Sequence, residues 1–228
     1  MGFSILFLAT GKGLLFTLAA ILPIINPLAT APLFVDFTHG MDRHASHRLA
    51  SSIGRHVVLL LAGALLIGSY VLRFFGVSLP VVRVAGGLIV ASMAWQLLNT
   101  QRSANTDKAH MAQTLSDEDV SMSAFYPMTF PLTCGPGSIS VAIAVGASLQ
   151  TPVWGQTVAN FAGGLVAVVL LGLIVTLTFR YADKLLGRLG EVGHIVFLRL
   201  MAFILLCVGI EIMWEGVRAL WGELAVMH

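Results

Sequence analysis

The residues best suited to bind a solute are small polar side chains that stand among prolines and glycines in two separate runs. The candidate binding residues are Asn26, Pro27, Thr30 and Pro32 in the first run, and Thr133, Gly135, Pro136, Gly137, Ser138 and Ser140 in the second. Hydroxyl and amide groups donate and accept hydrogen bonds, and glycine lets backbone approach a ligand closely. This chemistry indicates reversible binding of a small polar molecule.

Prolines interrupt both runs in the same way. Each run holds three prolines within ten residues, namely Pro23, Pro27 and Pro32, then Pro127, Pro131 and Pro136. A proline lacks the backbone N–H and clashes with the preceding turn, so we expect helices to unwind near Asn26–Pro32 and Pro131–Gly137. The half-helix that restarts after each break presents free amides and a positive dipole end, which suit an anionic group such as a carboxylate.

The composition places these runs inside a membrane. Hydrophobic residues make up 57% of the chain and charged residues 11%, whereas a soluble domain carries about a quarter charged residues. A helix needs about 20 apolar residues to cross a bilayer. The expected spans are 14–35, 53–72, 80–98, 124–147, 156–179 and 195–213.

The two proline triplets share one sequence offset, which also pairs Leu28 with Leu132. A duplication explains this better than chance and predicts a three-helix repeat over 1–98, a polar cytoplasmic linker over 99–120 and a second repeat over 121–228. Three spans in each half invert the second half relative to the first. We therefore predict an all-α integral membrane fold with six transmembrane helices, in two inverted three-helix repeats whose first and fourth helices are broken.

The distribution of Lys and Arg predicts the orientation. Most of these residues follow spans one, three and five, which places that side in the cytoplasm and both termini in the periplasm of a bacterial inner membrane. The net charge of +2 is too small to indicate a nucleic-acid partner. The expected partners are the lipid bilayer and a small-molecule substrate, and the oligomeric state stays open.

Four charged residues within or beside the spans are candidates for coupling or gating: Asp36, Arg83, Arg199 and Glu211. Charges at membrane depth are costly and often functional. The alternative for the two arginines is snorkelling to the interface, and for Glu211 it is an interfacial position near the periplasm. Asp36 ends the first span and is expected to face the cytoplasmic vestibule.

Transport by alternating access is the function that these features favour. An intramembrane hydrolase is an alternative because Ser138 lies in a glycine-rich segment, but no histidine stands at a matching depth to serve as its base. A membrane scaffold that moves no solute is a further alternative. No enzyme activity, metal or cofactor is predicted, beyond a proton or sodium ion that could couple transport.

At these residues the sequence resembles the MarC family of bacterial inner-membrane proteins, which is related to the LysE exporter superfamily. The matching motifs are Asn26-Pro27-x4-Pro32-x-Phe34-x3-Thr38, Arg83-x-x-Gly86-Gly87 and Pro131-Leu132-x2-Gly135-Pro136-Gly137-x-Ile139-Ser140. The resemblance runs over essentially the full length and implies six helices and proton- or sodium-coupled movement of small neutral amino acids such as glycine or alanine. Ala29 and Cys134 depart from the family pattern, which has glycine and a small apolar residue there.

Overall fold

The chain forms a bundle of helices. The computed structural model describes residues 2–99, 124–187 and 190–226, and no strand occurs among them. The elements are α1 (Gly2–Ile25), α2 (Pro27–Phe37), α3 (Arg43–Phe74), α4 (Leu79–Asn99), η2 (Ala124–Thr133), α6 (Pro136–Ser148), α7 (Trp154–Arg180), α8 (Ala182–Gly187) and α9 (Gly190–Val226). Helices α1, α3, α4 and α7 are each long and apolar enough to cross a bilayer. The predicted all-helical, multi-pass fold is confirmed at this level.

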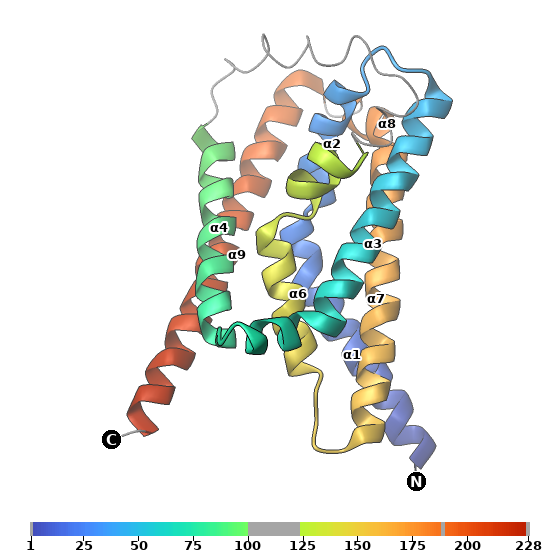
Figure 1. The fold of residues 1–228 in the computed structure, drawn as a ribbon. Coiled ribbons are helices and arrows are strands. Elements are labelled where there is room, and N and C mark those ends of the chain that lie inside the picture. Colours follow the sequence, from blue (N-terminus) through green and yellow to red (C-terminus); the bar gives the residue numbers. More distant parts are fainter. Residues whose placement is uncertain (1, 100–123, 188–189, 227–228) are drawn as a thin grey trace.

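The chain runs back and forth between the two ends of the bundle. Figure 1 shows that α1 begins and α9 ends at one end, whereas α4 ends and η2 begins at the other. The two chain ends thus lie on one side of the bundle, as an even number of crossings requires. Their periplasmic location stays a prediction, and nearly all of the predicted linker 99–120 lies outside the described residues.

The breaks in the first and fourth spans have one sequence cause. Backbone dihedrals leave the helical region at Asn26 (φ 39°, ψ 65°), Tyr126 (φ −122°, ψ 124°), Phe130 (φ −115°, ψ 122°) and Gly135 (φ −80°, ψ −178°). The next residue is proline in every case. A proline disfavours helical geometry in the residue before it, and every break lies at such a residue, although Pro23 and Pro32 stay inside helices.

The two breaks differ in extent from the sequence prediction. The expected unwinding over Asn26–Pro32 is confined to Asn26, because α2 begins at Pro27 and includes Pro32. A proline at the first helical position lacks only an N–H that would have no partner within the helix. Pro27 can therefore start α2 without disrupting it. The second break ends before Pro136, so that Gly137 lies in the first turn of α6, but it begins before the predicted Pro131, with non-helical backbone at Tyr126 and Phe130.

Two threonines make hydrogen bonds to backbone carbonyls of the distorted segment η2. The hydroxyl of Thr129 donates to the carbonyl of Ala124 at 2.6 Å, and that of Thr133 donates to the carbonyl of Met128 at 2.7 Å. Both side chains are buried. Because lipid offers no hydrogen bonds, these hydroxyls make an irregular segment tolerable at membrane depth.

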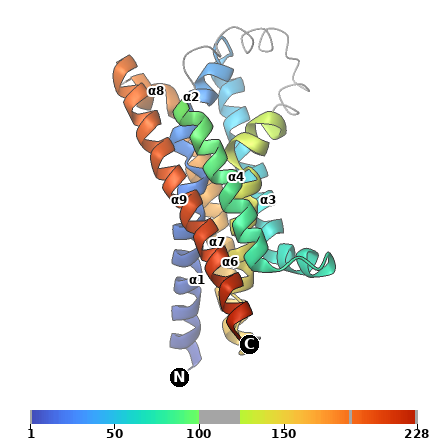
Figure 2. The same ribbon diagram turned by 90° about the vertical axis from the view of Figure 1, so that its left-hand side faces the viewer.

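Glycines let the helices pack closely in pairs. Helix α1 lies against α7, α3 lies against both α7 and α6, and α4 lies against α9 (Figure 2). At the last contact, a Cβ atom added at Gly209 would lie 2.6 Å from the backbone nitrogen of Ala91 and 3.0 Å from the carbonyl oxygen of Gly87. Small residues of this kind replace the hydrophobic effect as the basis of helix association in lipid.

We expect Gly209→Ala to destabilise the contact between α4 and α9, since the new methyl group would overlap backbone that cannot move aside. Overpacking of this kind costs about 1–3 kcal/mol. The apparent melting temperature of the purified protein in detergent measures the effect. Gly63→Ala in α3 is the matched control, because a Cβ atom there meets nothing within 4 Å. Equal melting temperatures for the two variants would contradict the close packing.

Candidate functional site

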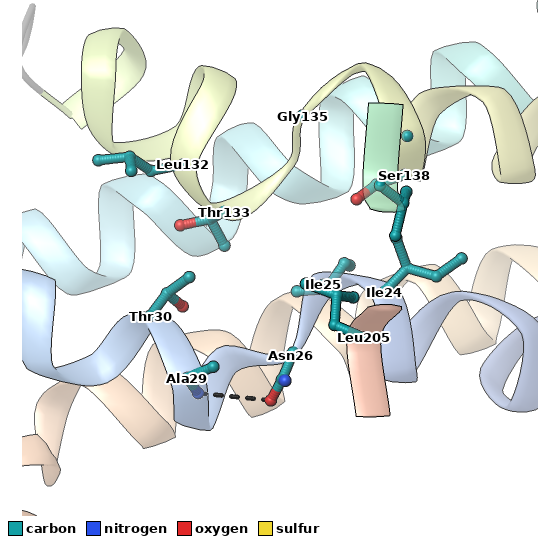
Figure 3. A pocket seen from close by; sticks show the side chains of 12 residues that line it. Ile24, Ile25, Asn26, Ala29, Thr30, Leu132, Thr133, Gly135, Ser138 and Leu205 are labelled. Atoms are coloured by element: carbon teal, nitrogen blue, oxygen red, sulfur yellow. Dashed lines mark hydrogen bonds between the residues drawn. The ribbon is translucent and has the colours of Figure 1, made fainter. Parts of the chain in front are cut away.

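A cavity lies where the two interrupted segments meet. Its volume is about 60 Å³, several times the roughly 10–15 Å³ that a single water molecule requires. Figure 3 shows side chains from α1, α2, η2 and α6 pointing into it. The lining residues are Ile24, Ile25, Asn26, Ala29, Thr30, Val90, Leu132, Thr133, Gly135, Gly137, Ser138 and Leu205.

Asn26 provides the polar group of the first break. Its left-handed backbone is one that asparagine tolerates better than most residues, and its side-chain oxygen accepts a hydrogen bond of 3.4 Å from the amide of Ala29 (Figure 3). The start of α2 is thereby capped. The side-chain nitrogen of Asn26 has no hydrogen-bond partner among the described residues, so it is free to donate to a solute in the cavity.

The second break presents an uncapped helix start. No side chain caps α6, whose first residue is Pro136, and the first backbone bond of the helix joins the amide of Ile139 to the carbonyl of Gly135 at 3.2 Å. The amides of Gly137 and Ser138 precede that bond and have no partner within the helix. The Ser138 side chain is 3% exposed, and within the described chain its hydroxyl has no partner. This wall supplies donors and a positive dipole end.

The end of α1 presents the opposite polarity. Ile24 and Ile25, the last two residues of α1, line the cavity. Pro27 has no N–H to donate to the carbonyl of Pro23. Because α1 ends at Ile25, the carbonyls of its last turn also lack the amide donors that a continuing helix would provide. The cavity therefore lies between the negative end of α1 and the positive end of α6.

The structure brings six of the ten predicted binding residues to the cavity: Asn26, Thr30, Thr133, Gly135, Gly137 and Ser138. The other four do not line it. Pro27 and Pro32 are buried beside the first break, Pro136 is half-buried at the start of α6, and Ser140 packs against Gly86 of α4. The structure settles the position of these residues, and their role in binding stays a prediction.

Sequence reasoning missed the apolar part of the lining. Val90 comes from α4 and Leu205 from α9, which are the third and sixth predicted spans. Both are ordinary apolar residues in apolar helices, so no motif distinguishes them from their neighbours. Four further apolar lining residues lie next to predicted site residues in the sequence. Their side chains are equally ordinary, so the sequence does not mark them as site residues: Ile24, Ile25, Ala29 and Leu132.

The charged candidates lie away from the cavity. Arg83 is half-buried, Arg199 and Glu211 are exposed, and none of them belongs to the lining. The side chain of Asp36 lies outside the described residues. All the lining residues are uncharged, and the part of the chain that the structure describes holds no group of three acidic, histidine or cysteine residues that could bind a metal.

Comparison with known proteins identifies the family. Residues 12–221 match the MarC family integral membrane proteins. This chain belongs to the MarC family. The match covers nearly all of the described helices, and it confirms the resemblance found in the two proline runs.

Relatives of this MarC family protein are inner membrane proteins. It is 32% identical to the inner membrane protein MarC of Salmonella arizonae over 219 residues, which cover 93% of this chain and 95% of the relative. The inner membrane proteins MarC of Citrobacter koseri and Escherichia coli are each 30% identical, with the same coverage. No solved structure matches the chain. The protein is accordingly a multi-pass protein of the inner membrane.

A contact between Gly137 and Val90 tests the geometry of the cavity in this MarC family protein. A Cβ atom added at Gly137 would overlap Cγ2 of Val90. We expect Gly137→Ala to destabilise the protein and Val90→Ala to relieve much of that loss. A double-mutant cycle on unfolding in detergent should give a coupling free energy of about 0.5–3 kcal/mol. Additive effects of the two substitutions would contradict the contact.

Proposed function

We propose that this protein is a secondary transporter of small polar solutes, with small neutral amino acids such as glycine and alanine as the substrate class. The observation that carries the proposal is the cavity between two interrupted membrane segments, lined by polar groups and by helix ends of opposite polarity. Discontinuous helices bind substrates in this way in many transporters.

The polarity of the cavity suits a zwitterion. The carboxylate of an amino acid would accept hydrogen bonds from the amides of Gly137 and Ser138 and from the Ser138 hydroxyl, at the positive end of α6. Its ammonium group would donate to the carbonyls that end α1. Asn26 would donate its free side-chain N–H to the carboxylate, and this geometry needs no charged side chain.

Pairwise helix contacts support alternating access through an inverted repeat. In an inverted repeat, α3 corresponds to α7 and α4 corresponds to α9. The contact of α4 with α9 and that of α3 with α7 are therefore each unchanged when the two halves are interchanged. The contact of α1 with α7 maps onto that of α3 with η2, and the contact of α2 with α7 maps onto that of α3 with α6. Such a repeat can adopt two packings that are related by the pseudo-two-fold axis in the membrane plane, and these would expose the cavity to either side of the membrane in turn. A proton or sodium gradient would drive the cycle.

The hydrolase alternative lacks a base. Ser138 lines the cavity, but a nucleophilic serine needs a base within hydrogen-bond distance, and no lining residue carries an ionisable group. In the proposed function, the protein therefore binds its solute and releases it unchanged.

Substitution of the two free donors tests the proposal. We expect Asn26→Ala and Ser138→Ala each to reduce the initial rate of radiolabelled glycine and alanine uptake into proteoliposomes by about tenfold, since a hydrogen bond to a charged group contributes roughly 1.5–3 kcal/mol. Membrane insertion and yield should stay normal. Ser148→Ala is the matched control, because that hydroxyl lies at the far end of α6 and donates to the carbonyl of Ala144 at 2.9 Å.

The same vesicles distinguish the transporter from a scaffold. Uptake should depend on an imposed proton or sodium gradient and should stop when an ionophore collapses that gradient. A wild-type protein that moves neither amino acid under any gradient would contradict transport of this class and favour a scaffold. Normal flux in both the Asn26 and the Ser138 variants would remove these residues from the binding site.

A further inference from the structure

Two apolar side chains close the cavity from the side of α4 and α9. Val90 is 3% exposed and Leu205 is 8% exposed, and both line the cavity. They belong to α4 and α9, which contain none of the predicted substrate-binding residues. A solute bound between the ends of α1 and α6 would therefore meet these two side chains with its own side chain.

Val90 lies directly against the start of α6. A methyl group of Val90 fits against Gly137 because glycine has no side chain. The carbonyl oxygen of Gly86 lies 3.6 Å from the position that a Cβ atom would take at Gly137. Ser140 packs on Gly86 one turn further along α6. These contacts hold α4 close to the donors that would receive the carboxylate, so little room remains beside it.

Helices α4 and α9 form a tightly packed pair, which fixes Val90 and Leu205 relative to each other. A Cβ atom at Gly87 would lie 2.6 Å from the carbonyl oxygen of Gly209, and one at Gly216 would lie 2.8 Å from the carbonyl oxygen of Pro80. Backbone contacts at several levels leave little freedom for one helix to retreat from the other. The apolar side of the cavity is therefore a firm boundary.

We infer that Val90 and Leu205 set the upper size limit of the transported solute, admitting short side chains and excluding branched ones. The inference rests on the proposed function and adds the residues that determine its specificity. A hydrophobic pocket discriminates between substrates that differ by one methylene by about 10- to 200-fold, so truncation of Val90 or Leu205 to alanine, which removes more than one carbon atom from the wall, should change selectivity measurably.

The test compares four substrates in proteoliposomes that contain the full chain. Initial uptake rates of glycine, alanine, valine and leucine are measured for the wild type, Val90→Ala, Leu205→Ala and the double variant. We expect the rate of valine or leucine uptake relative to that of glycine to rise at least about tenfold in Val90→Ala or in Leu205→Ala. The rise should be larger in the double variant. The rate of glycine uptake by each variant is the reference for its substrate ratios.

Val145→Ala is the matched control. Val145 is also 3% exposed and belongs to the same buried core, but it does not line the cavity. Its truncation should leave the substrate ratio at the wild-type value.

An unchanged ratio in all three cavity variants, with glycine uptake intact, would overturn the size limit and leave the proposed function standing. An equal rise in Val145→Ala would also overturn it, since selectivity would then reflect general loosening of the core. A wild-type protein that moves none of the four amino acids would overturn the proposed function and the size limit with it.

Discussion

The structure depends on one constraint: every backbone polar group at membrane depth must find a partner inside the protein. Continuous helices meet this requirement automatically, and the four proline-directed breaks at Asn26, Tyr126, Phe130 and Gly135 do not. The protein meets it locally with the Asn26 side chain and with the hydroxyls of two buried threonines. The remaining groups, at the end of α1 and the start of α6, face a shared cavity.

This constraint connects the fold to the proposed activity. Groups that stay unpaired inside lipid would destabilise the protein by several kcal/mol each, so they persist only where water or a solute can satisfy them. In the proposed function, a zwitterion would satisfy both helix ends at once and would then be released on either side. The close packing of α4 on α9 would supply the apolar boundary of that binding site.

The sequence predicts the apolar spans that form α1, α3, α4 and α7 and the break at Asn26, because long apolar runs and prolines act locally. It overestimates the length of the first break, since Pro27 starts a helix, and it starts the second break too late in the chain, since the backbone is already non-helical at Tyr126 and Phe130. It cannot identify Val90 or Leu205, whose importance comes from tertiary packing that leaves no local pattern. It also places Ser140 in the site, although that side chain turns toward α4, because residues of a short polar run occupy different faces of the helix.

In the proposed function, the solute occupies the cavity between the two breaks. The most direct measurement uses Thr30→Cys, at a lining position that holds no free donor, in a background with Cys134→Ala and Cys207→Ala. The rate at which a small thiol reagent labels the protein is followed with and without glycine. Glycine should slow labelling, with a half-maximal concentration close to that for its uptake. Labelling that glycine does not affect, in a variant that still takes up glycine, would contradict it.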